Sequence, residues 1–378
     1  MADYKKYQSD GVSAEDKALD KFAELMIEKI ESLKNSDSWK QPWFTEGSLR
    51  WPRNLSGREY NGMNALLLMM LCEKQNYKLP VFCTFNRAVG LNYTTDKQGA
   101  KKPITDADGQ PLPRVGINKG EKSFPVMLTT FTVVDKDTKE KINYEDYKRL
   151  SNDEKAQYNV YPKLNVYQVF NVDQTNLKEA RPDLYAKLES ENKLQRPFSG
   201  EGESFKFPAM GAMIAENKWI CPINLVHQDN AYFSISKNQI TLPEKSQFKD
   251  GESFYGTAFH EMTHSTGTAE MFNRFNPESG FGSAEYAKEE LVAELGSALV
   301  AQRYGMTKNL KDDSAVYMKS WLDSLKESPS FIKTTLMDVK RATSVITQRI
   351  DEVALELEAK QSQTNDKSVS MDAEAKVE

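Results

Sequence analysis

The chain has 378 residues, a length that favours two domains over a single hydrophobic core. With 39% hydrophobic and 28% charged residues it has the composition of a soluble globular protein. Its longest strongly apolar run, at 65–72, is far shorter than the roughly 20 residues that cross a bilayer, and residues 1–17 lack the apolar stretch of a secretory signal, so we expect a cytoplasmic protein without a membrane partner.

The distribution of charge and the cysteines indicate further what kind of protein this is. The net charge is −5, yet residues 51–125 hold 11 Lys and Arg against 6 Asp and Glu, a local balance of +5. Such an asymmetry permits a nucleic-acid-binding face in the N-terminal half. The three cysteines form no C-x-x-C pair, which indicates reduced, packed thiols and not a disulfide framework or a cysteine-rich zinc site.

The first half of the chain mixes helical and strand patterns. Apolar residues repeat at helical spacing over 16–34, and a second apolar helix is expected at 61–75. Short β-branched and aromatic runs at 112–134 and 160–172 predict strands, with a polar surface insertion near 135–158 between them. We therefore predict an α+β domain over 16–190, preceded by a flexible N-terminus at 1–15.

A polar segment with Gly and Pro, residues 191–204, is predicted as the linker to a second domain at 205–360. A hairpin is expected near 231–248, and the tail at 361–378 lacks periodicity, which predicts disorder. The second domain is therefore predicted to be mainly helical with a small β-sheet. Its helices are expected at about 252–266, 284–303, 313–327 and 330–358.

The second of these domains carries the sequence H-E-x-x-H, with His260, Glu261 and His264. Residues four apart on a helix point the same way, so both imidazoles can bind one ion. Glu261 then lies beside the open coordination position, where it can take a proton from metal-bound water. Because the chain has only three histidines, two of them at this spacing predict a zinc site holding one ion.

A third protein ligand is needed, and three candidates are open. Glu270 completes H-E-x-x-H-x-x-G-x-x-E, and His227 is the remaining histidine. Glu290 and Glu294 are again four residues apart and border an apolar stripe, where carboxylates are costly to bury unless they bind something. We prefer Glu290 as the ligand with Glu294 supporting a histidine, as in glutamate-type zincins.

Two details complete this hypothesis. Glu289, next to the preferred ligand, is expected to be an ordinary charged residue on the helix surface. The run at 238–248, directly before the motif helix, is compatible either with an edge strand that pairs with an extended peptide or with a plain structural hairpin.

Several blocks of sequence, in order, resemble one protein family. HEMTHSTG and YAKEELVAELGSALV in the second half are similar to the zincin-like domain of ArdC-type antirestriction proteins of plasmids and mobile elements. WKQPWF, PRNLSGREYNGMNALLL and NKGEKSFPVML in the first half are similar to that family's N-terminal domain. The resemblance spans about residues 16 to 350.

The resemblance implies an N-terminal domain that binds single-stranded DNA, a metallopeptidase-like C-terminal domain, and protection of incoming plasmid DNA during conjugation into a bacterium. Single-strand binding uses basic groups for phosphate and aromatic faces for stacking. The residues that offer such contacts to DNA are Trp39, Trp43, Arg53, Arg58, Tyr60, Arg87, Lys119 and Lys122. A host protein such as a restriction enzyme is a further expected substrate or target.

Four functions can be separated at this point. The leading hypothesis is a DNA-binding antirestriction protein with a zinc-dependent peptidase site, and the alternative is a non-catalytic single-strand-binding protein whose metal is only structural. A mimic of DNA needs dense negative charge, which −5 over 378 residues does not supply. A metalloprotease unrelated to DNA would show no salt-sensitive binding to single strands.

Overall fold

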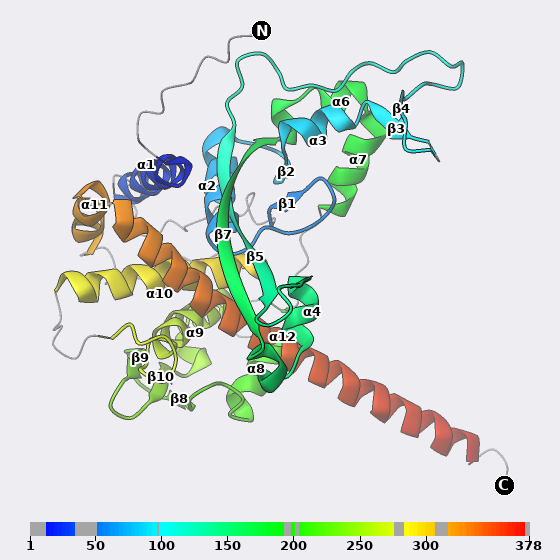
Figure 1. The fold of residues 1–378 in the computed structure, drawn as a ribbon. Helices are drawn as coiled ribbons and strands as arrows, with labels where there is room; N and C mark the ends of the chain where they lie inside the picture. Colours follow the sequence, from blue (N-terminus) through cyan, green and yellow to red (C-terminus); the bar gives the residue numbers. More distant parts are fainter. Residues whose placement is uncertain are drawn as a thin grey trace. The chain divides into compact units, whose positions relative to one another are not determined.

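The computed structural model describes residues 13–34, 51–96, 98–192, 198–200, 204–275, 283–306, 317–327 and 329–374 (Figure 1). Packing divides the chain into two compact units. The first unit comprises residues 1–22 and 81–187, and the second comprises residues 23–80 and 188–378. Each unit is therefore built from two separate stretches of sequence, and helix α1 (Ala14–Lys34) contributes to both.

This division differs from the predicted boundary, because residues 23–80 belong to the same compact unit as the C-terminal half. The physical reason is helix α2 (Met63–Gln75), which is apolar on nearly every side and buries most of its residues. Gly62, in front of it, has φ +54, and a Cβ there would lie 2.5 Å from Lys340 Cγ. The start of α2 thus packs directly on the long C-terminal helix.

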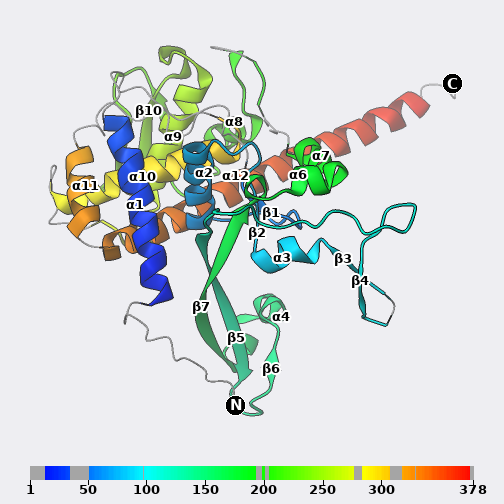
Figure 2. The ribbon, with the colours of Figure 1, turned by 90° about the horizontal axis from the view of Figure 1, so that it is seen from above.

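The first unit is organised around a long antiparallel ribbon (Figures 1 and 2). Strands β5 and β7 pair from Phe124 opposite Val169 to Asp135 opposite Tyr158, and among the strands of this unit the order is β2-β7-β5-β6. The predicted strand at 112–134 begins only at residue 124, because Pro113, Gly116 and Gly120 interrupt the segment before it. The strands are β2 (Val81–Cys83), β3 (Tyr93–Thr95), β4 (Lys101–Pro103), β5 (Phe124–Asp135), β6 (Lys141–Ile142) and β7 (Tyr158–Asn171).

The polar insertion predicted near 135–158 lies at one end of the ribbon, where Figure 2 shows α4 and β6 beside β5. Phe131 of the ribbon stacks on Tyr144 with ring centroids 4.2 Å apart, which fastens the insertion to the strand. The helices of this part of the chain are α3 (Phe85–Gly90), α4 (Tyr144–Arg149), α5 (Asn152–Lys155), α6 (Leu177–Ala180) and α7 (Pro182–Glu191), with a 3-10 turn at Val172–Gln174.

The second unit contains a small three-stranded sheet in the order β8-β10-β9. Strands β9 (Tyr232–Ser234) and β10 (Gln239–Pro243) form an antiparallel hairpin at the place expected for one. The run at 238–248 is not an edge strand, because β8 (Ile223–Val226) pairs in parallel on the other side of β10. The antiparallel edge of this sheet is β9.

Four helices follow the hairpin close to the expected positions, and α9, α10 and α12 pack against one another (Figure 1). The last helix is described as far as Glu374, beyond the end expected near 358, and the disorder predicted for 361–378 stays a prediction. No Gly or Pro interrupts 359–374, and adding residues to an existing helix is easier than starting one. The helices are α8 (Pro208–Ala215), α9 (Gly251–Ser265), α10 (Ala284–Arg303), α11 (Met318–Glu327) and α12 (Pro329–Glu374), with a two-residue strand β1 (Arg53–Asn54) and a 3-10 turn at Lys245–Gln247.

Within the part of the chain that the structure describes, no helix is both long enough and apolar enough to cross a lipid bilayer. The core of the second unit joins the sheet to the helices, and it includes Ile240 and Leu242 of β10 with Phe259 and Met262 of α9. These residues fix α9 on the sheet, which sets the direction of the histidine-bearing face.

Candidate metal centre

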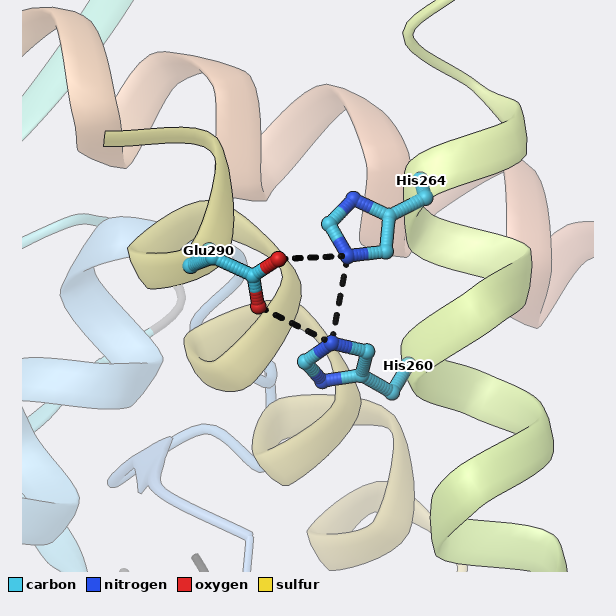
Figure 3. Close-up of side chains that lie close together, drawn as sticks. All are labelled: His260, His264 and Glu290. Atoms are coloured by element: carbon cyan, nitrogen blue, oxygen red, sulfur yellow. Dashed lines mark hydrogen bonds and ion pairs between the residues drawn. The ribbon is translucent and has the colours of Figure 1, made fainter. Parts of the chain in front are cut away.

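Helix α9 presents two histidines from one face. Asp250 caps its start, because its Oδ1 accepts a hydrogen bond from the Ser253 amide at 2.7 Å. The helix is buried over most of its length, with His260 1% exposed. His260 and His264 lie one turn apart, so their imidazoles project side by side towards α10 (Figure 3).

Helix α10 brings a carboxylate to the two imidazoles because the two helices approach closely. A Cβ at Gly296 of α10 would lie 2.8 Å from Thr263 Cγ2 of α9, so only glycine permits this separation. The close approach places Glu290, nearly two turns before Gly296, opposite the histidines (Figure 3). Glu290 is 8% exposed.

The three side chains converge on one point. His260 Nε2 and His264 Nε2 are 3.1 Å apart. Glu290 Oε2 lies 3.4 Å from His260 Nε2, and its Oε1 lies 3.7 Å from His264 Nε2. Ligand atoms bound at about 2.0–2.1 Å around a tetrahedral ion are about 3.3 Å from one another. The observed spacing therefore fits two nitrogen ligands and one carboxylate around a single cation, and these are the described residues whose donor atoms gather within 4.8 Å.

The outer ring nitrogens of both histidines face carboxylates of α10. Glu294 Oε1 is 3.6 Å from His260 Nδ1, and Glu289 Oε1 is 3.2 Å from His264 Nδ1. A carboxylate at Nδ1 favours the tautomer in which Nδ1 carries the proton and Nε2 offers its lone pair. Both imidazoles are thus set to use Nε2 as the ligand atom.

The expectation for Glu289 was wrong. Its side chain is 11% exposed, and it receives two hydrogen bonds from Arg274 as well as facing His264. Burial by itself raises the pKa of Glu289, but the hydrogen bonds and charges of Arg274 and His264 lower it below its usual range. The error arose because the sequence gives no sign of Arg274, which comes from the loop after α9.

The charges of the cluster match a divalent cation. Glu261, Glu289, Glu290 and Glu294 are all largely buried, whereas Arg274 adds one positive charge. Several buried carboxylates repel one another strongly unless cations neutralise them. The chemistry of the donors, two imidazoles and a carboxylate, is that of a zinc-type site.

The pKa values of Glu290 and His264 reflect the charges of their neighbours. Burial works against the charged form of Glu290, yet the hydrogen bond from His260 and the charges of both histidines lower its pKa. Burial likewise opposes the charged His264, but Glu289, Glu290 and Glu261 together raise its pKa. The carboxylates thus favour a positive charge at His264, and a metal ion bound at Nε2 would supply that charge in place of a proton.

Tyr286, one turn before Glu290, is a site residue that the sequence analysis missed. Burial raises the pKa of its hydroxyl, and the neighbouring Glu290 and Glu261 raise it further, so Tyr286 is a neutral hydrogen-bond donor to Glu290. Its ring is half-buried against Tyr317. Its spacing of four residues from Glu290 on a predicted helix is the signal from which it could have been found.

Two family models match the chain. Residues 16–170 match the model described as the N-terminal domain of anti-restriction factor ArdC, and residues 211–336 match the model described as a zincin-like metallopeptidase. The chain is an ArdC-type protein. The prediction of two domains with mixed helix and sheet, the second zincin-like, is confirmed.

Solved structures have the same fold as this ArdC-type protein. The antirestriction ArdC protein from the R388 plasmid, in a metal-free and an Mn(II)-bound structure, superposes with a TM-score of 0.58 at 22% sequence identity. The alignment to the metal-free structure covers 88% of this chain and 98% of that one.

Curated relatives are much longer proteins. Two Escherichia coli proteins named DNA primase TraC are 29% and 26% identical, over 90% and 85% of this chain but only 20% and 26% of their own lengths. The uncharacterized protein y4eC of Sinorhizobium fredii is 33% identical over 28% of this chain and 34% of its own. The ArdC-type chain thus spans about a fifth to a third of the curated relatives that it matches.

The two other proposed ligands lie apart from the convergent group of the ArdC-type chain. The His227 side chain is 81% exposed at the end of β8, with its Nδ1 3.6 Å from Glu244. Glu270 is exposed in the loop after α9. Neither belongs to the group formed by His260, His264 and Glu290.

The proposed DNA-contacting residues are placed very differently from one another. Arg58, Arg87, Lys119 and Lys122 are exposed. Arg53 is half-buried, and its guanidinium donates to Glu191 O at 2.8 Å and to Asn192 Oδ1 at 3.2 Å.

The aromatic residues of the same prediction have less freedom to meet DNA bases. Tyr60 is half-buried, and its carbonyl accepts from Trp51 Nε1 at 2.7 Å. Trp51 in turn lies under the Arg303 guanidinium at 5.4 Å. Trp39 and Trp43 lie outside the described residues. The exposed basic residues are therefore the ones available to phosphate.

Proposed function

We propose that this ArdC-type chain is an antirestriction protein that binds single-stranded DNA and carries one zinc ion in a peptidase-type site. The observation that carries the proposal is the convergence of His260 Nε2, His264 Nε2 and the Glu290 carboxylate, with Glu261 on the same helix. The similarity to the antirestriction protein of the R388 plasmid supports the biological role. We expect the protein to act in the bacterial cytoplasm, on DNA of a mobile element that enters by conjugation.

In the catalytic form of the proposal each residue has one task. A zinc ion held by His260, His264 and Glu290 would supply the Lewis acidity that polarises a carbonyl and acidifies a water. Glu261 accepts the proton of the attacking water and later delivers it to the leaving amine. Tyr286, neutral and adjacent to Glu290, is able to donate a hydrogen bond to the oxygen on which negative charge develops. The substrate would be a host protein such as a restriction enzyme.

The DNA-binding part rests on charge and exposure. Arg87, Lys119 and Lys122 are exposed residues of the first unit. All three lie within the stretch that matches the ArdC N-terminal domain. Cationic side chains bind single strands by releasing counterions from phosphates, without reading sequence. This matches a protein that must coat whatever DNA enters the cell.

A second function is favoured by the depth of the site. His260 and Glu261 are only 1% and 2% exposed, and both histidines are backed by carboxylates. Structural zinc sites are closed, whereas catalytic sites keep an open position. In this alternative the protein protects by coating single strands alone, and its metal only stabilises the fold.

Replacing Glu261 with Gln separates the two functions, because Gln keeps the size of the side chain but cannot act as a base. Protection is measured as the transfer efficiency of a conjugative plasmid into a restricting host, together with zinc content and oligonucleotide affinity. If E261Q keeps zinc and DNA binding but loses protection, catalysis is required. If E261Q protects like the wild type, the metal is structural and the peptidase assignment is wrong.

A further inference from the structure

The loop that follows α9 folds back over the metal centre, so that the side chain of Arg274 contacts both α9 and α10. The Arg274 amide donates to Gly267 O at 2.9 Å, which closes the loop directly after the motif helix. The Arg274 side chain is 5% exposed. Burying a charged guanidinium is costly unless it is well paired, so the partners of Arg274 indicate what it does beside the proposed metal site.

The Arg274 guanidinium donates two hydrogen bonds to a single carboxylate, that of Glu289. Arg274 Nε donates to Glu289 Oε2 at 2.8 Å, and Nη2 donates to Glu289 Oε1 at 2.8 Å. This two-point geometry fixes the carboxylate plane as well as its position. The same Glu289 Oε1 lies 3.2 Å from His264 Nδ1. A continuous chain of contacts therefore leads from Arg274 through Glu289 to the imidazole.

Arg274 is also tied to the end of α9. Its Nη2 donates to Thr263 O at 2.8 Å, and its Nη1 donates to Thr266 Oγ1 at 3.0 Å. The arginine thus joins the helix that carries the histidines to the helix that carries the carboxylates. A lysine cannot reproduce this, since a single ammonium lacks the planar set of donors.

From this geometry we propose that Arg274 is a positioning residue of the metal centre, which orients His264 through Glu289 and thereby sets the affinity for the metal. This inference rests on the proposed metal site. Glu289, held in place, accepts a hydrogen bond from the Nδ1–H of His264 and leaves the Nε2 lone pair free to bind the metal. Without Arg274, Glu289 would be a buried carboxylate with one remaining partner, among three other carboxylates, and it would turn away towards water.

If the role of Arg274 were purely electrostatic, its removal would change the zinc affinity in the opposite direction. Removing a positive charge makes the cluster more negative, which by itself strengthens the attraction for a cation. Loss of ligand orientation weakens binding instead, by about 10- to 100-fold when the residue that supports a histidine ligand is removed. The sign of the change in zinc affinity therefore decides between the two roles.

The test is a zinc titration of the full chain in competition with a chromophoric chelator. We expect R274Q, R274K and E289Q each to bind zinc about 10- to 100-fold more weakly than the wild type, and the R274Q/E289Q double variant to be no weaker than E289Q. The matched control is R349Q, which also breaks an arginine contact to a carbonyl and a glutamate, those of Lys218 and Glu352. Its zinc affinity is expected to equal that of the wild type.

A second readout follows the imidazole directly. The chain has three histidines, so long-range ¹H–¹⁵N spectra of the zinc-loaded protein resolve each ring. In the wild type we expect His264 to carry its proton on Nδ1, and in R274Q we expect that signal to broaden or shift while His227 stays unchanged. A variant that fails to fold is replaced in this test by R274K or E289Q.

The outcomes distinguish this inference from the function on which it rests. If the wild type binds zinc no more tightly than the H260A/H264A variant does, the assignment of the metal site is wrong. If the histidines are needed for zinc but R274Q, R274K and E289Q bind it as tightly as the wild type or more tightly, the site stands and the role of Arg274 is overturned.

Discussion

The metal centre and the proposed DNA-binding residues are opposite kinds of site. At the metal centre, helical spacing on α9 and α10 and one close helix approach determine where each donor atom lies. Four of the five basic residues proposed for DNA are instead exposed on loops and short elements: Arg58, Arg87, Lys119 and Lys122. The first site is therefore tested by single substitutions with large effects, and the second by groups of substitutions with small ones.

The largest expected effect is the loss of the metal itself. The H260A/H264A variant removes both nitrogen ligands, so it should retain no zinc after gel filtration, whereas the wild type should retain about one ion per chain. At free zinc 1,000-fold above the Kd the wild type gains about 4 kcal/mol of stability, which this variant should not show. Elemental analysis and thermal unfolding with and without a chelator measure both.

His227 supplies the control for this experiment, because its side chain is 81% exposed and lies outside the convergent group. H227A should bind zinc like the wild type. A wild-type protein without zinc, or an H227A variant that loses it, would show that the buried cluster is not the metal site.

Glu290 provides the next largest effect. E290A removes the third ligand, and zinc affinity should fall by more than the roughly 100-fold that a supporting residue contributes. E290Q, which keeps one oxygen donor, should lose less. E270A is the control, since Glu270 is exposed in the loop after α9. Unchanged zinc affinity in E290A would refute the ligand assignment, and a loss confined to E270A would favour the other candidate.

The sequence was most informative where helical periodicity connects residues. The spacing of His260 and His264, and of Glu290 and Glu294, predicted which side chains share a face, and the structure places each carboxylate near a histidine. Periodicity does not relate a helix to a loop that folds back on it, so Glu289 looked like a surface charge until Arg274 was seen beside it.

The same limit explains the differences in the fold. The hairpin of β9 and β10 was predicted from local pattern, but its position in the sheet depends on β8, whose pairing is not local. Likewise, α2 was predicted as an apolar helix, but which unit buries it depends on α12, more than 250 residues later. Local preference predicts elements, whereas distant packing decides their neighbours.

A third prediction tests the close approach that assembles the metal centre. In G296A the added methyl meets Thr263 Cγ2 at 2.8 Å, so α9 and α10 must move apart. We expect a loss of about 1–3 kcal/mol in the free energy of unfolding and weaker zinc binding. The double variant G296A/T263A removes the opposing atoms and should recover part of both in urea unfolding and zinc titration. A G296A protein as stable as the wild type would contradict the packing argument.

The smallest effect is expected at the DNA-binding residues, where three exposed cations are compared with one that is engaged. Binding of a fluorescent oligo(dT) to R87Q/K119Q/K122Q, measured over a range of salt, should show a slope of log K against log salt that is less steep by about 2, since each phosphate contact on a single strand contributes about 0.7. R53Q should leave the slope unchanged and lower stability instead, because Arg53 already donates to Glu191 O and Asn192. If R53Q flattens the slope and the triple variant does not, the phosphate contacts lie around Arg53 in the second unit and not at the exposed residues of the first. If neither variant alters the slope, residues outside both sets make the phosphate contacts, and exposure alone is a poor guide to this interface.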